Sequence, residues 1–446
     1  MKYLVGLAAL VTLVSVAGAG ASSVTKNGAS ADSVYAWNLT AINTLNALPP
    51  AAGGAAPAAQ VEMGMVEGAV YDAVNAITPK HYRPYLLTRR FSAAASTDAA
   101  VATAAYEVLR NIVSTVPSIS DAARQAALQA LAASYAGSLA AVNDDSFKRQ
   151  GIDAGHAAAE AMIAARQDDG RFGPSQWKPN PAAGHWSPLL DANNNPILDP
   201  SPWVGGVTPF LLESSSQFRS VDPLAIESPA YAEELNEVKA KGSATAPPDV
   251  RTPDQTYIAR WWQSNPMISW NDVGTQLAKD DGFDALDAAR LFAMQNLTGA
   301  DAAINCWNDK YHFDFWRPWN AIRRAAEDKN PATDTDPSWS PLFSAPYPEY
   351  VSGHNCLDGG HVRVLRMFFP NAPAGGYSIT SRSTLIQATD PKTRSFDSFS
   401  EALAELIEAR IWAGLHFRTG DVEGQRLGRN VADYMAAHFF QPVGNH

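Results

Sequence analysis

The sequence predicts an all-α protein made of two helical bundles joined by a long Pro/Trp-rich crossover. Apolar residues recur with helical spacing along much of the chain. Alternating runs rich in Val, Ile and Thr, which are typical of strands, are nearly absent. A single proline- and tryptophan-rich stretch interrupts the helical pattern. With 446 residues, of which 46% are hydrophobic and 18% charged, the chain is long enough to form more than one bundle-sized core.

The first bundle is expected within residues 22–170. In Gln60–Ile77 the apolar residues fall on one stripe that includes Val61, Met65 and Ala73. Three further ranges show the same spacing: Asp98–Thr115, Ser120–Ala136 and Asp145–Gln167. Ser120 or Asp121 is a suitable cap for the helix that follows it.

The crossover is expected at residues 171–230, which hold many of the prolines. A connection of this length in a compact protein is usually functional or packs as a covering layer. Its aromatic residues favour packing, and they include Trp177, Trp186, Trp203 and Phe210. Helical spacing resumes near Tyr231, so residues 231–446 are expected to form a second bundle, which carries the site described below.

The first residues have the pattern of a secretory signal peptide. Lys2 supplies the positive start, Tyr3–Val16 is apolar, and small residues follow as far as Ala21. We expect residues 1–21 to be removed and the protein to be secreted or periplasmic. The alternative is an uncleaved membrane anchor, but the apolar run is short for a bilayer span. No later segment resembles a transmembrane helix.

The net charge of -11 argues against two classes of partner. The chain is acidic and has no run of Lys and Arg, so neither nucleic acid nor an anionic membrane surface is expected to bind it.

The first chemical motif is KYHFDFWRP, from Lys310 to Pro318. Lys310 and Arg317 are seven residues apart, which places them on the same face of a continuous helix. Cations on an apolar face need an anion, because a buried unpaired charge is costly. Asp314 is one candidate partner, and the simpler interpretation is a helix surface with internal ion pairs. Pro318 is expected to end the helix.

The second motif is PEYVSGH, which ends in Ser352, Gly353 and His354. Ser352 is a good N-cap, and an amphipathic helix follows it. These residues would therefore stand at a helix N-terminus, where backbone N–H groups and the helix dipole favour an anion. The alternative is an ordinary capped helix with a surface histidine. His361, further along the same helix, is expected to be a packed residue.

The third motif is RIWAGLH, from Arg410 to His416. Arg410 falls on an apolar stripe, where an arginine usually has a buried partner. His416 does not share that face, so we expect the helix to end near Gly414 and to turn His416 back toward the site. Asp421 is interpreted either as the N-cap of the next helix or as the carboxylate that orients His416.

The two cysteines, Cys306 and Cys356, each lie beside a motif. If the motifs converge, the cysteines could converge too, and an exported protein permits a disulfide. Two buried thiols are an equally good interpretation.

Together the motifs resemble the superfamily of vanadium-dependent haloperoxidases and type-2 phosphatidic acid phosphatases. The superfamily pattern is Lys-x6-Arg-Pro, then Pro-Ser-Gly-His, then Ser-Arg-x5-His-x3-Asp. The first element is complete in this chain. The second has Val351 in place of proline, and the third has Ala409 in place of serine and Asp421 one residue late. The resemblance covers roughly the last third of the chain.

The resemblance implies a cradle for vanadate, with phosphate able to occupy the same place. Lys310, Arg317 and Arg410 would neutralise the oxygens. Ser352 and the Gly353 N–H would add hydrogen bonds.

The resemblance also implies separate roles for the two histidines. His416 would bond to vanadium or attack phosphorus, and His354 would be the acid–base group. Lys310 would also polarise peroxide.

The favoured function is a haloperoxidase that acts on halide, hydrogen peroxide and a small organic acceptor. The length of the chain, its export signal and an aromatic residue at Trp307 favour it, while Tyr347 leaves the halide open. The alternative is an acid phosphatase that works through a phosphohistidine at His416. A non-catalytic oxyanion-binding protein is the third interpretation, although mere binding needs neither histidine.

Overall fold

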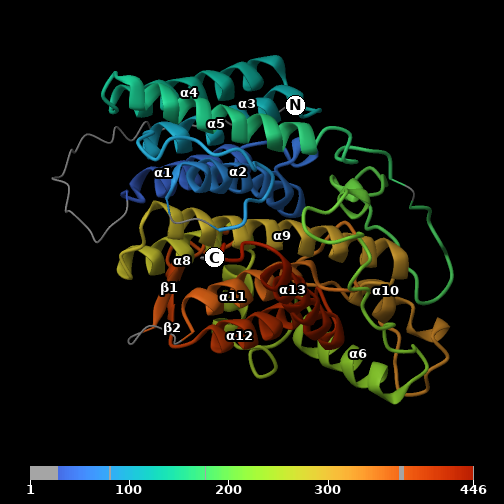
Figure 1. Cartoon of the computed structure of the whole chain (residues 1–446). Coiled ribbons are helices and arrows are strands. Elements are labelled where there is room, and N and C mark those ends of the chain that lie inside the picture. Colours follow the sequence, from blue (N-terminus) through green and yellow to red (C-terminus); the bar gives the residue numbers. More distant parts are fainter. Residues whose placement is uncertain (1–28, 80–81, 176, 371–375, 445–446) are drawn as a thin grey trace, which may run out of the picture.

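The computed structural model describes residues 29–79, 82–175, 177–370 and 376–444. Within these ranges it contains thirteen α-helices, three short 3-10 helices and one two-stranded sheet. The all-α prediction is confirmed. Figure 1 shows the helices in two layers, with the earlier helices above and the later helices below.

The upper layer consists of five helices: α1 (Asp32–Asn46), α2 (Ala56–Ile77), α3 (Thr97–Thr115), α4 (Asp121–Ala140) and α5 (Ser146–Ala165). Two predicted starts agree with the structure, because Ser120 caps α4 and Asp145 caps α5 through their side chains. The single apolar stripe predicted for α2 is wrong, because this helix is buried on every side. It packs against α3, α5 and α9, so its whole circumference is covered.

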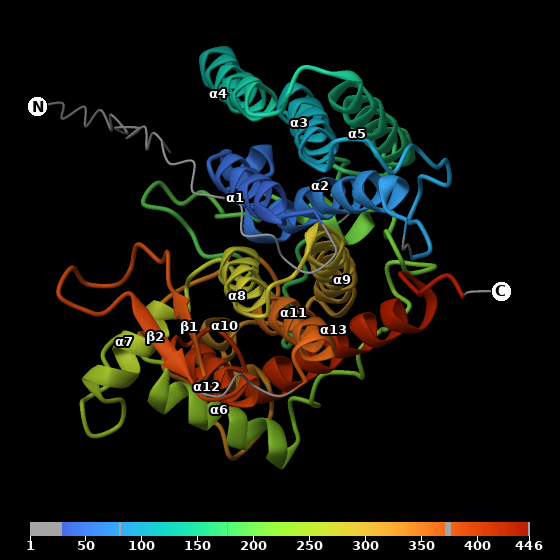
Figure 2. The same ribbon diagram turned by 60° about the vertical axis from the view of Figure 1, so that its left-hand side comes forward.

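The lower layer consists of eight helices: α6 (Pro229–Lys241), α7 (Pro253–Trp261), α8 (Pro266–Asp280), α9 (Ala285–Phe313), α10 (Pro318–Arg323), α11 (Gly353–Phe368), α12 (Phe399–Trp412) and α13 (Arg418–His438). The 3-10 helices are η1 (Pro50–Ala52), η2 (Pro202–Gly206) and η3 (Ala325–Glu327). The long helix α9 packs against α2 of the upper layer and against α11 and α13 of the lower layer, as Figure 2 shows. It is therefore the shared centre of the fold.

The sheet was not expected from the sequence. Strands β1 (Tyr377–Thr380) and β2 (Thr393–Phe396) pair antiparallel, with Tyr377 opposite Phe396. Both aromatic rings are buried, whereas the hydroxyls of Thr380 and Thr393 meet on the exposed face. Each strand has only four residues, which is too short for alternation to be visible in the sequence.

The segment between the layers covers the outer side of α9. Its backbone N–H groups at Phe210, Leu211 and Leu212 all donate to the carboxylate of Asp301 in α9, over 2.7, 2.7 and 2.9 Å. Further along α9, Asp309 accepts from the Ser220 N–H over 3.0 Å. Irregular backbone must satisfy its polar groups when it is buried, and side chains of α9 do so here.

Within the described residues no helix is both long and apolar enough to cross a bilayer. Residues 1–21 lie outside the described residues, so the signal peptide stays a prediction.

Replacing Asp301 with Ala should lower the free energy of unfolding by about 3 kcal/mol, because three buried N–H groups lose their acceptor. Urea unfolding followed by circular dichroism measures this loss. The control is Asp433→Ala, which removes an exposed ion pair with Arg363 and should cost less than about 1 kcal/mol. Equal losses of unfolding free energy in the two variants would contradict the role of Asp301 in holding the crossover backbone on α9.

Candidate functional site

The structure brings the three motifs to one place in the lower layer. Arg317 follows the end of α9, Ser352 and Gly353 begin α11, and His416 lies in the short turn between α12 and α13. The positive charges of Arg317, Lys310 and Arg410 all act on His416. The predicted convergence of these side chains is therefore what the structure shows.

Arg317 is fully buried and only partly paired. Its Nε donates to the Tyr347 carbonyl over 2.9 Å, and its Nη1 donates to the Leu415 carbonyl over 2.7 Å and to His416 Nε2 over 3.1 Å. Its Nη2 is buried without a partner among the described residues. Burial lowers the pKa of Arg317 to about 10. An unpartnered guanidinium N–H at this depth is available to an anion.

Arg410 repeats this arrangement on α12. Its Nη1 donates to Gln263 Oε1 over 3.2 Å, and its Nε is buried without a partner in the described part of the chain. Burial lowers the pKa of Arg410, against the opposite effect of the nearby Asp421 carboxyl. Two buried guanidiniums with unused N–H groups therefore face one site.

His416 is held as a neutral imidazole whose single lone pair, on Nε2, accepts from Arg317. Because an arginine N–H can only donate, Nε2 must be the acceptor of the bond from Arg317, and the proton must lie on Nδ1. Nδ1 then donates to Glu349 Oε1 over 2.7 Å. Burial, with the charges of Arg317 and Lys310 beside it, holds the pKa of His416 well below its usual value. The Nε2 lone pair is thus directed into the site.

Glu349 orients His416, and sequence reasoning missed it. Its Oε1 also accepts from the Phe417 N–H over 3.2 Å. Burial raises the pKa of Glu349 to about 7, although Arg317 and Lys310 oppose the rise. The available signal was a lone carboxylate between Pro348 and Tyr350, three residues before the predicted N-cap.

Asp421 was predicted to cap the next helix or to orient His416, and both interpretations are wrong. Asp421 lies inside the first turn of α13, which starts at Arg418 with Phe417 at its N-cap. Its carboxylate accepts from Asn355 Nδ2 over 2.7 Å, and it also bonds to Ser352. It therefore fixes the start of α11.

The N-terminus of α11 lies at the site, as predicted. The hydroxyl of its N-cap residue Ser352, however, does not cap the helix. Ser352 occupies the N-cap position without a side-chain capping bond, and its Oγ accepts from Asn355 Nδ2 over 3.2 Å. A Cβ on Gly353 would lie 2.8 Å from the Trp307 ring, so only glycine fits there. The first backbone N–H groups of α11 have no intrahelical acceptor and can bind an anion.

His354 is a second neutral imidazole, with a different free nitrogen. Its Nε2 lies 3.0 Å from the Ser264 carbonyl oxygen, which can only accept, so the proton lies on Nε2. Burial and the charge of Arg410 keep the pKa of His354 well below its usual value. Its Nδ1 is therefore free to accept a proton.

Lys310 departs from its predicted contacts. Its ammonium donates to the carbonyls of Pro348, Glu349 and Val351 over 3.2, 2.9 and 2.5 Å. The Trp307 ring lies 5.6 Å and the Tyr347 ring 5.2 Å from Nζ. Lys310 thus holds the turn that leads into α11 and acts on the site through its charge. Burial lowers the pKa of Lys310 to about 8.

The continuous helix expected from Lys310 to Arg317 is wrong. Helix α9 ends at Phe313, and Asp314 adopts a left-handed conformation with φ of 49°. Arg317 becomes the N-cap of α10, and Pro318 starts that helix rather than ending the earlier one. Asp314 pairs with Trp177 and His185 instead of with the cations.

Three other predictions concern residues around the site. Helix α12 ends at Trp412, and Gly414 has a φ of 72°, which gives the expected turn before His416. His361 is packed as expected, with its Nε2 2.9 Å from Gln60 Oε1. Cys306 and Cys356 are buried free thiols in this structure.

Comparison with known proteins gives similarities of sequence and fold. Residues 290–445 match the family model described as the VCPO second helical-bundle domain. A vanadium chloroperoxidase of Curvularia inaequalis is 26% identical over 281 residues, covering 49% of this chain and 45% of that protein. The match thus spans less than half of that relative. The family-model match and this relative support the vanadium haloperoxidase superfamily.

Solved structures of the superfamily share the fold. The structure titled the first bacterial vanadium-dependent iodoperoxidase superposes with a TM-score of 0.73 at 20% identity, covering 95% of this chain and 100% of that one. A holo-type bacterial vanadium-dependent chloroperoxidase gives a TM-score of 0.70 at 16% identity, covering 92% and 98%. At these identities the likeness describes the fold alone.

The donors at this site fit a tetrahedral oxyanion such as the vanadate of this superfamily. Two buried guanidinium N–H positions lack partners within the described ranges. The start of α11 adds backbone donors, and His416 Nε2 supplies a lone pair. Glu349 and Asp421 each use one carboxylate oxygen, on His416 and on Asn355, and the second oxygen of each is buried without a partner among the described residues. The unpartnered N–H groups of the two arginines are the part of the site that favours an anion.

Sulfate binding to the protein should weaken as the pH rises through about 8. The pKa of Lys310 is lowered to about 8, so its charge, which favours anion binding, is present below this pH and is lost above it. Sulfate keeps its own charge across this range, so calorimetric titration between pH 6 and 9.5 reports the protein alone. Lys310→Arg should remove the step, because arginine stays charged. If sulfate affinity falls by the same amount near pH 8 in Lys310→Arg, the titrating group is not Lys310.

Proposed function

We propose that this protein is a vanadate-dependent haloperoxidase that oxidises halide with hydrogen peroxide. The observation that carries the proposal is the neutral His416, whose Nε2 lone pair meets Arg317, beside two buried arginines that each keep an unpartnered N–H among the described residues. A single imidazole bond surrounded by N–H donors matches a tetrahedral oxyanion of a metal.

Vanadate would be held by His416 Nε2, by the guanidiniums of Arg317 and Arg410, and by the Gly353 N–H at the start of α11. When bound, vanadate activates hydrogen peroxide toward attack by halide. Glu349 keeps the proton on Nδ1 of His416, so that Nε2 carries the lone pair, which vanadate would take over from Arg317. Lys310 adds positive charge and holds the turn that positions Gly353.

His354 is the proposed acid–base group. Its proton lies on Nε2, on the Ser264 carbonyl, so Nδ1 can take a proton from peroxide and later return it to a departing oxygen. The low pKa of His354 keeps Nδ1 unprotonated when no anion is bound.

The same donors would also hold phosphate, so a phosphatase with a phosphohistidine at His416 is the competing function. The named relatives, which are vanadium haloperoxidases, support the peroxidase. The indole of Trp307 against Gly353 supports it as well, because it gives the site an apolar wall beside the oxyanion cradle.

In the presence of bromide and hydrogen peroxide, the purified apoprotein should brominate a reporter dye only after vanadate is added. It should hydrolyse p-nitrophenyl phosphate poorly. Phosphate should reduce halogenation in parallel with vanadium loss, because the two anions share donors. Hydrolysis that vanadate inhibits, without any halide oxidation, would select the phosphatase.

A binding experiment should distinguish the roles of His416 and His354. His416→Ala should abolish vanadate retention in equilibrium dialysis, because it removes the imidazole that would bond to vanadate. His354→Ala should retain vanadate and lose about 10²–10⁴-fold in turnover, which is the usual contribution of acid–base help. The control is His156→Ala, at an exposed histidine of α5. Equal loss of vanadate from both site variants would refute the division of roles.

A further inference from the structure

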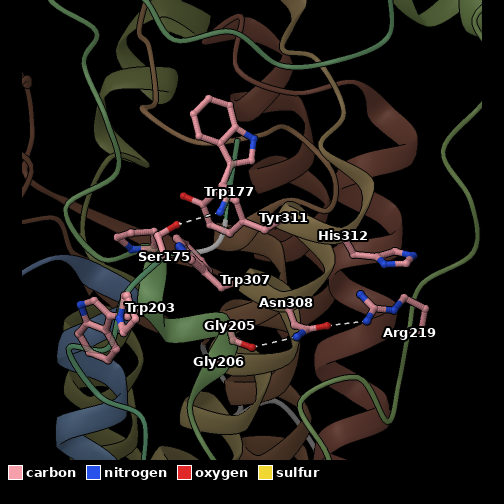
Figure 3. A pocket seen from close by; sticks show the side chains of 12 residues that line it. Ser175, Trp177, Trp203, Gly205, Gly206, Arg219, Trp307, Asn308, Tyr311 and His312 are labelled. Atoms are coloured by element: carbon pink, nitrogen blue, oxygen red, sulfur yellow. Dashed lines mark hydrogen bonds between the residues drawn. The ribbon is translucent and has the colours of Figure 1, made fainter. Parts of the chain in front are cut away.

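A second cavity lies on the outer side of α9, under the crossover segment, and Figure 3 shows its lining. Its volume is about 420 Å³, within the usual range for small-molecule sites. Four aromatic side chains form its walls: Trp177, Trp203, Trp307 and Tyr311. Arg219 and His312 lie on the opposite side.

Two partly buried carboxylates behind the walls fix three of these rings. Trp307 Nε1 and Tyr311 OH both donate to Asp199 Oδ2, over 2.9 and 2.8 Å. Trp177 Nε1 donates to Asp314 Oδ1 over 2.7 Å. The polar edges of these rings are therefore used by the protein. Trp203 and Trp307 are buried against other rings, whereas Trp177 and Tyr311 are partly exposed and present aromatic surface to the cavity. Rigid rings with their polar edges satisfied favour stacking by another ring.

The polar side of the cavity is close to neutral. Arg219 Nη1 donates to Asp309 Oδ1 over 2.6 Å, and its Nη2 donates to Asn308 Oδ1 over 2.5 Å. The guanidinium is 30% exposed and keeps N–H groups that these bonds do not use. Because Asp309 balances its charge, it can donate to a hydroxyl oxygen without selecting for an anion.

The cavity and the oxyanion site share one wall. Trp307 lines the cavity, while the same ring contacts Tyr347 at a centroid distance of 5.1 Å and closes on Gly353. A ligand stacked in the cavity would thus be one indole away from the first turn of α11.

We propose that this cavity binds a neutral, planar aromatic compound of the phenol or naphthol class, which is the acceptor of the halogen. The acceptor role rests on the proposed function. An electron-rich ring carbon attacks the halogen of hypohalous acid, a C–X bond forms and the X–O bond breaks. The ring proton leaves with the hydroxide as water, so the carbon is oxidised and the halogen is reduced.

The first test needs neither vanadate nor activity. Calorimetric titration of the protein with 2-naphthol should give binding at least about tenfold tighter than with decahydro-2-naphthol, the saturated form of the same skeleton. Equal affinities, or no binding of 2-naphthol up to its solubility, would overturn the proposal. A carboxylate added as 6-hydroxy-2-naphthoate should not improve affinity by tenfold, and such a gain would replace the neutral class with an anionic one.

A matched pair of variants locates the ligand. A Cβ added at Gly206 meets no atom within 4 Å, so Gly206→Leu extends into the open space of the cavity. It should weaken 2-naphthol binding at least about tenfold. Gly137→Leu places the same side chain in open space on α4 and should leave binding unchanged. Unchanged binding in Gly206→Leu would place the ligand elsewhere.

The outcomes separate the two proposals. If 2-naphthol binds as expected and no halide oxidation is found, the aromatic site stands and the proposed function fails. If halide is oxidised while 2-naphthol and its saturated form bind alike, the haloperoxidase stands without an acceptor site. Should Gly206→Leu not fold, as judged by its melting temperature, the comparison of the two ligands on the unaltered protein still decides.

Discussion

Three buried cations organise the second half of this molecule. Lys310 and Arg317 are fully buried and Arg410 is 5% exposed. Burying like charges together is costly unless carbonyls or anions offset them. Backbone carbonyls satisfy Lys310, whereas the two arginines keep unused N–H groups. The nearby carboxylates of Glu349 and Asp421 offset part of this charge, and the unused N–H groups of the arginines are what a bound oxyanion would satisfy.

Glu349 links these three cations to His416. Its carboxylate lies close enough to Arg317 and Lys310 to feel their charge, yet its hydrogen bonds go to His416 and Phe417. The cations thus hold a carboxylate in place, and the carboxylate holds a proton on Nδ1. A single chain of interactions sets both the charge of the site and the tautomer of its imidazole.

The sequence predicts helices well where their caps are local. Ser120 and Asp145 begin α4 and α5 as expected, because the start of each helix depends on a hydrogen bond between the cap side chain and a backbone N–H three residues away. It fails where distant contacts decide. The break after Phe313 depends on Asp314 meeting Trp177 and His185, which are more than a hundred residues away. Likewise, spacing singled out Asp421, but the folded chain brings Glu349 to His416 from another loop.

The same break explains why the C-terminal part of α9 borders both the oxyanion site and the aromatic cavity. Because α9 ends before Arg317, the chain turns and carries Arg317 away from the helix that bears Trp307 and Tyr311, while Lys310 stays on α9. The side of α9 with these two rings is then free for the crossover, whose Asp199 fixes both rings. Trp307 consequently has an edge bound to the crossover and a ring closing on α11. A change in the crossover that moved this indole would alter the oxyanion site without touching any of its donors.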